Sequence, residues 1–584
     1  MCGIIGYIGK RDALPILLKG LKRLEYRGYD SVGLAILFNK DLQIFKKVGK
    51  VKDLEEEVKK YKLKAYLGIA HTRWATHGSV KECNAHPQIS CKGEIAIVHN
   101  GIIENYKEIK EELKDHKFLS ETDSEVIAHL LEEEYNKTRN YIKATLNTVA
   151  KLKGSFAFLA LIKPLNLIIG ARLDSPLAIG IGNKEYFLSS DVLGFVEYTD
   201  DVIFLNNREV CFILNDSLTL IDFDGKRIKG EITKVAKELI DLSNTAFEHY
   251  TLKEIHEQSK VISLALKQEE SRFKLFLEGV MKADKIYFTG CGSSYHAALL
   301  ASYLFNRFLK LNTNSVMASE FEGIMEILDS KTLIIGISQS GETADLLSCI
   351  REAKKKRAKV YAIVNNINSS LAREVEIFLP LNCGPEVGVA ATKSFTAQLA
   401  LLYKLSLSYN TELLDEMKNL ELYVQEVLKL EKDIKELALK YKDSKDFYFI
   451  GRGIHYPIAL EGALKLKELS YIHAEGLAAG ELKHGPLALI SEGIPTLVIN
   501  PKDDTYNKTL SNASEVKARG AKVIGLSDEF NSIYDEYIRI PKVKEIFYPL
   551  LDVIPLQLLA YYITLQKELN PDYPRNLAKS VTVT

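Results

Sequence analysis

The chain has 584 residues, more than one hydrophobic core usually supports, so we expect two or three domains. Lysine plus arginine equals aspartate plus glutamate at 77 each, and this zero net charge provides no long-range field for polyanions, which argues against nucleic acid as a partner. The 7 cysteines are odd in number and never spaced as C-x-x-C, which argues against a disulfide framework and fits a reducing, cytoplasmic compartment.

Cys2 stands directly before a glycine in the N-terminal segment MCGIIGYIG. If Met1 is removed, Cys2 carries both a thiol and a free α-amine, which titrates near pH ~8 and can act as a base. Nucleophile and base then come from one residue. The alternative is a cysteine that packs as a small apolar side chain, and this segment alone does not decide between the two.

The region up to about residue 240 combines helical patterns with short β-rich segments. We expect helices near 12–25, 104–115 and 123–136, and strands at 156–162, 167–172, 176–181 and 211–215. These elements predict a mixed sheet domain. From 241 to 280 the pattern becomes polar and helical, as in a connecting segment, so we place the domain boundary there.

An internal repeat organises the second half of the chain. YFTGCGSSY at 287–295 aligns with YFIGRGIHY at 448–456, an offset of 161 residues. Each copy reads as strand, glycine turn and helix, followed by alternating strands and helices, with buried strands at 333–337 and 359–364 in the first copy. This pattern predicts two doubly wound, mostly parallel sheets, in which ligands lie beyond the carboxyl ends of the strands.

Polar residues follow strand 333–337 as Ser338-Gln339-Ser340-Gly341-Glu342-Thr343, ahead of a helical pattern at 344–356. Hydroxyls, an amide and free backbone N–H groups at a helix start favour a phosphate, because the helix dipole and the unpaired donors attract an anion. A simple helix cap, the alternative, needs only one such residue. No lysine follows the glycine as in nucleoside-triphosphate loops, which points to a sugar phosphate or a similar monophosphate.

The second copy adds groups that can move protons. A helical pattern at 461–469 places Lys465 and Glu468 three residues apart on one face, and His484 follows in a loop bounded by glycine and proline. A carboxylate, an imidazole and an ammonium in one pocket could shift protons between adjacent sugar carbons. A Lys/Glu pair at this spacing is otherwise a solvated helix face, and we weigh the two interpretations equally.

The apolar segment 548–565 is interrupted by Pro549, Asp552, Pro555 and Gln557, and the N-terminus lacks a basic region followed by a long apolar stretch. We therefore expect neither secretion nor a membrane span. The segment is better explained as a buried helix in a core or a subunit interface.

Together these motifs resemble those of the glutamine–fructose-6-phosphate aminotransferases, also called glucosamine-6-phosphate synthases. The resemblance runs from Cys2 to the C-terminal tail. Its segments are YRGYDS at 26–31, HTRWATHG at 71–78, VHNG at 98–101, SQSGET at 338–343, VGVA at 387–390 and PRNLAKSVTV at 574–583.

The resemblance implies a multidomain protein of the α/β and α+β classes. An N-terminal-nucleophile glutaminase sandwich would span 2–240, a linker 241–280, and two doubly wound parallel-sheet sugar-isomerase subdomains 281–425 and 440–584. It also implies a homodimer, without cofactor or catalytic metal, that converts fructose 6-phosphate and glutamine into glucosamine 6-phosphate and glutamate. This reaction is the first step of UDP-N-acetylglucosamine synthesis.

For the glutamine half, the resemblance implies that Cys2 forms a glutamyl thioester, with its own α-amine as base. Asn100 and the Gly101 N–H would form the oxyanion hole, where preorganised donors are worth ~3 kcal/mol each. Arg73 would hold the α-carboxylate of glutamine and Asp123 its α-ammonium, with structural ion pairing as the alternative for both.

The same resemblance places Thr76, His77 and His86 in the glutamine pocket. Trp74, the only tryptophan, matches the residue that gates an enclosed ammonia passage between the two sites of the family. Such a passage is needed because ammonia released into neutral water is mostly protonated and no longer nucleophilic. A buried core tryptophan is the alternative.

For the sugar half, the resemblance assigns the phosphate to Ser338, Gln339, Ser340 and Thr343, with Ser294, Val389 and Ala578 also in the substrate pocket. Glu468 would move the proton between C1 and C2. His484 is implied in ring opening, Lys579 in imine formation with the open ketose, and Lys465 in nearby proton transfer.

The chain departs from the family pattern at several positions. Gln88 replaces the second histidine of H-P-H, Asp174 stands where a glycine is usual, Ser259 replaces a proline of the linker, and Thr584 ends the chain in place of glutamate. None removes a functional group, but Asp174 could alter a turn beside the glutamine pocket.

Two rival functions and one metal site were weighed against this interpretation. An amidotransferase acting on phosphoribosyl pyrophosphate should carry a phosphoribosyl-binding strand and loop with acidic residues, which we do not find. A sugar-phosphate-sensing regulator would not need Cys2, Asn100 and Asp123 together. A metal site could be assembled from Cys83, His86, Cys91 and His99, but their spacing matches no standard zinc pattern.

Overall fold

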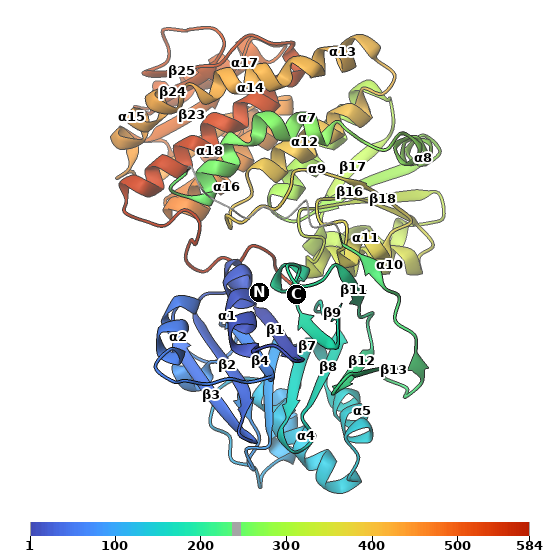
Figure 1. The fold of residues 1–584 in the computed structure, drawn as a ribbon. Coiled ribbons are helices and arrows are strands. Elements are labelled where there is room, and N and C mark those ends of the chain that lie inside the picture. The colour runs from blue at the N-terminus through green and yellow to red at the C-terminus, as the bar shows by residue number, and fades with distance from the viewer. Residues whose placement is uncertain (1, 236–246, 583–584) are drawn as a thin grey trace. The chain divides into compact units, whose positions relative to one another are not determined.

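The structure is a computed structural model, and it describes residues 2–235 and 247–582 (Figure 1). The chain divides into two compact units, Met1–Asp241 with Ala578–Thr584, and Leu242–Leu577. The predicted boundary at residues 240 and 241 lies outside the described residues.

The first unit contains two sheets. The strands of one sheet are β1 (Gly3–Ile8), β2 (Ser31–Phe38), β3 (Asp41–Val48), β4 (Leu67–Arg73), β9 (Ala178–Gly182), β10 (Glu185–Ser189), β11 (Asp201–Phe204) and β15 (Thr233–Lys234). Those of the other are β5 (Gln88–Ile89), β6 (Ile95–Ile103), β7 (Gly154–Ile162), β8 (Leu167–Leu173), β12 (Glu209–Leu214), β13 (Ser217–Asp222) and β14 (Arg227–Ile228).

The strand orders are β15-β11-β9-β10-β1-β4-β2-β3 and β14-β13-β12-β8-β7-β6-β5. All neighbouring strands in these two sheets pair antiparallel, so the expectation of a mixed sheet is wrong. The reason is that many successive strands are joined directly, and short connections favour antiparallel neighbours.

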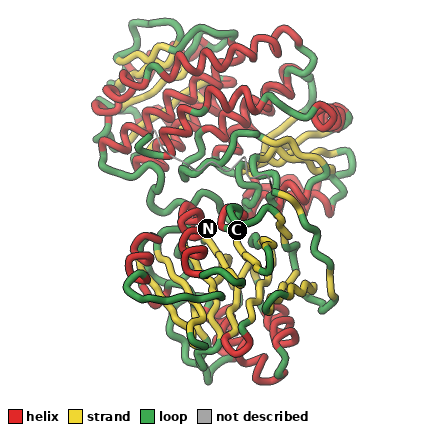
Figure 2. Tube along the Cα trace, viewed as in Figure 1, coloured by secondary structure: helices red, strands yellow, loops and turns green. Residues whose placement is uncertain are grey.

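The first unit is a four-layer sandwich, as Figure 2 shows. Apolar side chains of both sheets, such as Ile4, Val98 and Leu159, pack together between them. Helices α1 (Ala13–Leu24) and α2 (Val51–Val58) cover one sheet, and α3 (Tyr106–Glu112), α4 (Glu125–Thr138) and α5 (Tyr141–Lys151) cover the other. This arrangement explains why β1 is apolar on both faces and confirms the predicted sandwich.

The second unit contains two five-stranded sheets. Their strands are β16 (Lys285–Gly290), β17 (Thr313–Met317), β18 (Thr332–Ser338), β19 (Lys359–Val364) and β20 (Ile377–Pro380), and β21 (Asp446–Gly451), β22 (His473–Ala478), β23 (Pro495–Ile499), β24 (Lys522–Ser527) and β25 (Glu536–Arg539). The orders are β17-β16-β18-β19-β20 and β22-β21-β23-β24-β25, with parallel pairing throughout. The two copies thus share one topology, as the repeat predicts.

Helices surround both sheets of the second unit. They are α6 (Tyr250–His256), α7 (Gln258–Ala265), α8 (Glu270–Met281), α9 (Ser293–Phe308), α10 (Ala344–Lys355), α11 (Ser370–Glu374), α12 (Lys393–Ser406), α13 (Thr411–Glu416), α14 (Leu420–Leu428), α15 (Glu431–Tyr441), α16 (Tyr456–Ser470), α17 (Tyr506–Lys517) and α18 (Tyr548–Gln566). One continuous apolar core joins side chains from both copies.

The segment Glu545–Gln566 is long and apolar enough to cross a membrane, but its most apolar window is 100% buried inside the structure. Its helix α18 packs in the shared core of the second unit, where side chains such as Leu551 and Leu558 are fully enclosed. The expected buried helix is therefore confirmed.

Candidate active sites

Cys2 lies immediately before β1, in the wall of a small cavity. The cavity is lined by Cys2, Arg73, Trp74, Thr76, His77, His86, His99, Gly101, Thr122, Asp123 and Ser124. These include every residue predicted for the glutamine half except Asn100, whose Nδ2 donates to the Cys2 carbonyl oxygen at 2.8 Å. Trp74 is a half-buried wall residue, so it is not a core tryptophan.

The backbone around Cys2 fixes the position of its sulfur. The Gly3 N–H donates to Thr72 Oγ1 at 3.1 Å, and a Cβ at Gly3 would lie only 2.6 Å from that oxygen, so glycine permits this close approach. Thr72 lies on β4, and Trp74 directly follows that strand. The Trp74 N–H donates to Cys2 Sγ at 3.1 Å. The sulfur is therefore held at the cavity wall.

The cavity contains two buried charges of opposite sign, Arg73 and Asp123, each 3% exposed. The Arg73 guanidinium donates to backbone carbonyl oxygens, including that of Gly78 at 3.2 Å, and Asp123 Oδ2 accepts the Ile103 N–H at 2.8 Å. Within the described residues, no ion pair engages either side chain, so the structural ion-pair alternative is wrong. A buried charge without a counter-charge is costly, which makes both groups natural contacts for a charged ligand.

The Cys2 thiol is not activated by its surroundings alone. Burial raises the pKa of the Cys2 thiol, although the Trp74 N–H and the nearby Arg73 charge oppose this shift. The thiol therefore carries its proton at neutral pH. Its reaction as a nucleophile requires a base.

Three neutral histidines are buried at the cavity: His86 and His99 line it, and His71 stacks on His86. Burial lowers the pKa of each ring, that of His71 to about 3. Because His71 Nε2 lies 2.9 Å from the His99 carbonyl oxygen and 3.1 Å from Asn100 Oδ1, it donates to both and turns the Asn100 amide N–H groups towards Cys2. Sequence reasoning assigned no role to His71, although it lies in the same motif as Arg73.

The departures from the family pattern lie outside the residues that line the cavity. Gln88 is buried and donates to the Ala85 carbonyl oxygen at 3.1 Å. Asp174 adopts φ +66°, the left-handed conformation that favours glycine, and its carboxylate accepts from Asn207 Nδ2 at 2.8 Å. The turn therefore holds an aspartate in a conformation that glycine adopts more readily.

A second candidate site lies at one edge of the first parallel sheet of the second unit. The strand order reverses between β16 and β18, and in such folds this switch point is where ligands bind. Ser294 lies in the first turn of α9, the helix after β16, and the segment 338–343 begins at the last residue of β18. Gln398 Nε2 donates to Ser294 Oγ at 3.1 Å, which orients that hydroxyl.

The hydroxyls of the 338–343 segment do not cap α10. Ser338 Oγ accepts the Gly341 N–H at 2.9 Å, Ser340 Oγ accepts the Glu342 N–H at 3.2 Å, and Thr343 is the N-cap residue but makes no side-chain cap bond. The capping alternative is therefore wrong. The Thr343 hydroxyl and the first N–H groups of α10 stand at the switch point, as an anion site requires.

A row of charges on α16 adjoins the start of α9. Lys465 Nζ lies 2.5 Å from Glu468 Oε2 and 3.5 Å from Glu461 Oε1. Glu461 also accepts from Ser293 Oγ at 2.8 Å and lies 2.7 Å from His296 Nδ1. Ser293 and His296 are close to Ser294 in the chain. Lys465 is 1% exposed, so the solvated-face interpretation is wrong.

The environment of Lys465 keeps it charged. Burial disfavours the ammonium, but the carboxylates of Glu468 and Glu461 outweigh it and raise the pKa of Lys465 above its ordinary value. A lysine of this kind holds carboxylates in place and does not accept protons at neutral pH.

The remaining residues predicted for the sugar half are His484, Val389, Ala578 and Lys579. His484 ends the 3₁₀ helix Ala479–His484 and is exposed, and the Val389 N–H donates to the Asp572 carbonyl oxygen at 3.3 Å. Ala578 and Lys579 group with the first unit. Their predicted roles in the sugar site stay predictions.

The matching switch point of the second copy is closed by the chain itself. Buried His455 follows β21, with its Nδ1 2.9 Å from Asp552 Oδ2 and its Nε2 3.1 Å from Asp503 Oδ2. Burial opposes protonation, but hydrogen bonds and charge from both carboxylates raise the pKa of His455 to about 9. An internal cation therefore occupies the edge where the first copy has hydroxyls.

Two domain families match the chain. Residues 71–193 match a glutamine amidotransferase domain, and residues 280–408 and 440–567 match the SIS domain.

Full-length relatives and a solved structure agree with these matches. The glutamine–fructose-6-phosphate aminotransferases (isomerizing) of Thermococcus kodakarensis and Pyrococcus horikoshii are each 46% identical to the chain, and the alignments cover 100% of it and of each relative. The C-terminal domain of glucosamine-fructose-6-phosphate aminotransferase from Francisella tularensis superposes with a TM-score of 0.52 at 36% identity, covering 56% of this chain and 99% of that one.

Gly101→Ala should destabilise the first unit more than Gly93→Ala. Gly101 has φ +123°, and a Cβ there would lie 2.0 Å from the Ser155 carbonyl oxygen, whereas Gly93 has φ +67° with no atom within 4 Å. We expect the free energy of unfolding to fall by about 1 kcal/mol in Gly93→Ala and by about 3 kcal/mol or more in Gly101→Ala. Thermal unfolding of both variants measures the difference, and equal melting temperatures would contradict the close approach of β6 and β7 at this point.

His455→Gln should destabilise the second unit in a pH-dependent manner. Removing the cation leaves the fully buried Asp552 carboxylate without a counter-charge, while Asp503 keeps its hydrogen bonds from Thr505, and the cost is about 3–5 kcal/mol. Because the folded pKa of about 9 exceeds the ordinary value of 6.5, the stabilisation is complete below pH 6.5 and is lost as the pH rises through about 9. The melting-temperature gap between wild type and variant should therefore narrow from pH 6 to pH ~9.5, and a constant gap would refute the charged histidine.

Proposed function

The chain belongs to the glutamine–fructose-6-phosphate aminotransferase family, and we propose that it carries out the reaction named by its relatives through the two sites described above. The amide nitrogen of L-glutamine passes to D-fructose 6-phosphate, which isomerises to D-glucosamine 6-phosphate, and L-glutamate is released. The 46% identity over the whole chain supports this activity.

One observation carries the glutamine half of the proposal. A buried guanidinium and a buried carboxylate, neither of which has an ion-pair partner among residues 2–235 and 247–582, line one cavity with a cysteine sulfur. An α-amino acid carries the two complementary charges on adjacent atoms. We propose that Arg73 holds its carboxylate and Asp123 its ammonium, which points the side-chain amide towards Cys2. Thr76, His77 and His86 complete the pocket wall.

The thiol chemistry follows from this orientation. The Cys2 sulfur attacks the amide carbonyl, its proton passes to the α-amine that Met1 removal leaves on Cys2, and the C–N bond breaks as ammonia takes up that proton. The Asn100 amide and the Gly101 N–H stabilise the oxyanion, and water then releases glutamate from the thioester. The raised pKa of the Cys2 thiol supports the need for this base.

For the sugar half, we propose that the phosphate binds at the switch point between β16 and β18. Ser338, Gln339, Ser340 and Thr343 contact it, with Ser294, Val389 and Ala578 at the pocket wall. The uncapped start of α10 and the oriented Ser294 hydroxyl support this placement.

The isomerisation requires a group that moves a proton between C1 and C2. We propose Glu468 for this step, with Lys465 as the fixed charge that positions its carboxylate, because the raised pKa of Lys465 makes that ammonium a poor base. His484 takes part in ring opening, and Lys579 forms the imine with the open ketose. Ammonia passes from the glutamine site to the sugar without release, with Trp74 controlling its passage.

The proposed division of the chain is a glutaminase domain at 2–240, a linker at 241–280, and sugar-isomerase subdomains at 281–425 and 440–584. The domain matches at 71–193, 280–408 and 440–567 support it. We further propose that the protein is a cytoplasmic homodimer that binds neither nucleic acid nor membranes. Light scattering on the purified protein measures the oligomeric state.

Incubation with amide-¹⁵N-glutamine and fructose 6-phosphate tests the function. The wild type should place label in glucosamine 6-phosphate. Cys2→Ala should abolish glutamine hydrolysis but keep slow isomerisation of the sugar phosphate, because the two chemistries use separate residues. Glu468→Gln should do the reverse. Wild-type protein that never labels an amino sugar would overturn the proposal and favour a sugar-phosphate sensor.

Asp123→Asn should weaken glutamine binding specifically. Loss of the buried carboxylate that pairs with the glutamine ammonium weakens the binding free energy of glutamine by about 2 kcal/mol or more, which raises its KM roughly thirtyfold. The KM for fructose 6-phosphate should be unchanged. Asp115→Asn, an exposed carboxylate eight residues away along the same segment, is the matched control and should behave as wild type. A normal glutamine KM in Asp123→Asn would refute the ammonium contact.

A further inference from the structure

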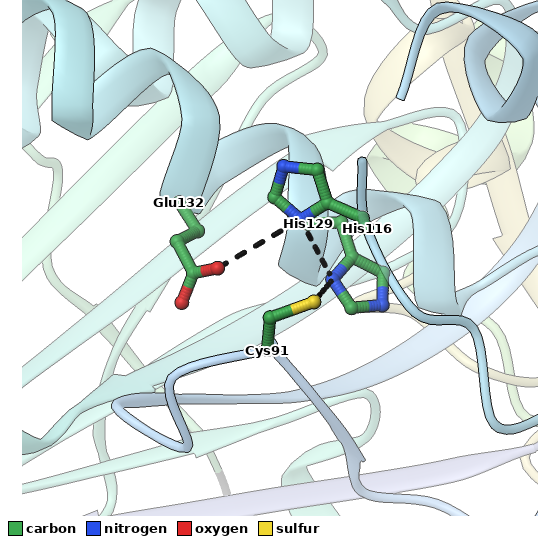
Figure 3. Close-up of side chains that lie close together, drawn as sticks. All are labelled: Cys91, His116, His129 and Glu132. Carbon is green, nitrogen blue, oxygen red and sulfur yellow. Dashed lines mark hydrogen bonds and ion pairs between the residues drawn. The ribbon is translucent and has the colours of Figure 1, made fainter. Parts of the chain in front are cut away.

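A cluster of four side chains in the first unit lies outside both sites. Cys91 in the turn between β5 and β6, His116 after α3, and His129 and Glu132 on α4 point towards one another (Figure 3). One potential ligand atom from each lies within 4.8 Å of all the others. We call these residues the Cys91 cluster; His129 and Glu132 are buried, and Cys91 is at the surface.

The spacing of the ligand atoms matches a tetrahedral metal centre. His129 Nδ1 lies 3.5 Å from Cys91 Sγ and 3.3 Å from His116 Nδ1. With Zn–N bonds of about 2.0–2.1 Å and a Zn–S bond of about 2.3 Å, tetrahedral geometry places nitrogen about 3.5 Å from sulfur and about 3.3 Å from nitrogen. Glu132 Oε2 lies 3.8 Å from His116 Nδ1, and a shift of only a few tenths of an ångström would bring this pair to tetrahedral spacing.

The outer nitrogens of both rings face carboxylates. His129 Nε2 lies 3.3 Å from Glu125 Oε1, and His116 Nε2 lies 3.5 Å from Glu133 Oε2. Each carboxylate favours the proton on Nε2, so in the neutral rings both Nδ1 lone pairs point into the cluster. Two lone pairs 3.3 Å apart repel unless a cation lies between them, and carboxylates behind ligand histidines are typical of zinc sites.

Backbone N–H groups support the two remaining ligands. The Lys117 N–H donates to Cys91 Sγ at 3.2 Å and helps to fix the position of the sulfur. The Lys92 N–H donates to Glu132 Oε1 at 3.1 Å and leaves Oε2 facing the cluster. Thiolate and imidazole ligands together favour zinc over calcium or magnesium, which prefer oxygen.

We propose that Cys91, His116, His129 and Glu132 bind one Zn²⁺ ion as a structural site of the first unit. Four protein ligands close the coordination sphere, and none of them lines the Cys2 cavity, so the ion has no catalytic role. It ties the β5–β6 turn and the segment after α3 to helix α4.

The proposed ion also supports the glutamine pocket indirectly. Glu125, which contacts the zinc ligand His129, accepts the backbone N–H groups of Leu119 and Ser120, each at 2.7 Å. These residues belong to the segment that carries Asp123 into the cavity. The sequence suggested a different set with Cys83, His86 and His99, but His86 and His99 line the Cys2 cavity, and Cys91 lies instead with His116, His129 and Glu132.

Metal analysis and cobalt spectroscopy of the full-length protein test the proposal. Protein purified with zinc should contain one equivalent, and after chelation and loading with Co²⁺ it should show a thiolate-to-cobalt charge-transfer band and the intense visible bands of tetrahedral cobalt. Cys91→Ser should lose the charge-transfer band, and His116→Ala should lose at least tenfold in metal affinity. Cys83→Ser is the matched control, because Cys83 is also exposed and lies outside the cluster, and it should retain both.

Three results would overturn the zinc site. Wild-type protein that binds no zinc, or cobalt-loaded protein without a thiolate band, would overturn the site even if the variants fail to fold. So would a Cys91→Ser variant with an unchanged spectrum. Glutamine hydrolysis is followed in parallel: a wild type that binds zinc through Cys91 but hydrolyses no glutamine would leave the zinc site standing and refute only the proposed function.

Discussion

A charged side chain taken out of water needs an opposite charge, and this constraint decides which parts of the molecule are complete and which await a ligand. His455 and Lys465 each lie between two carboxylates supplied by the chain, so their surroundings are closed. Arg73 and Asp123 are equally buried but have no ion-pair partner among the described residues, and they face a cavity beside Cys2. The proposed glutamine would supply the two complementary charges.

The same constraint distinguishes the two copies of the repeated fold. Both sheets have one strand order and one switch point, so topology alone would allow a ligand at either edge. In the first copy that edge carries hydroxyls and an uncapped helix start, which suit an external anion. In the second copy a buried imidazolium, His455, already lies between carboxylates. The second copy instead contributes α16, whose Glu461 reaches Ser293 at the start of α9.

Periodicity and local motifs predicted most of the architecture, because apolar strands, glycine turns and the repeat are properties of neighbouring residues. Most of the cavity residues were also predicted, since the matching motifs name them directly, but His99, Thr122 and Ser124 were not assigned to the cavity. The interactions that were missed join distant segments. His455 depends on Asp552, 97 residues later, and the Cys91 cluster on α4 packing over the β5–β6 turn. The antiparallel pairing of the first unit was likewise decided by hairpin connections that composition does not reveal.

The shared core of the second unit has an evolutionary implication. Side chains of both copies belong to one apolar cluster, α18 crosses it, and the Ser293–Glu461 contact spans the copies. Each half therefore needs the other to bury its apolar surface. Exchanging one half for that of a distant homologue would have to preserve this packing.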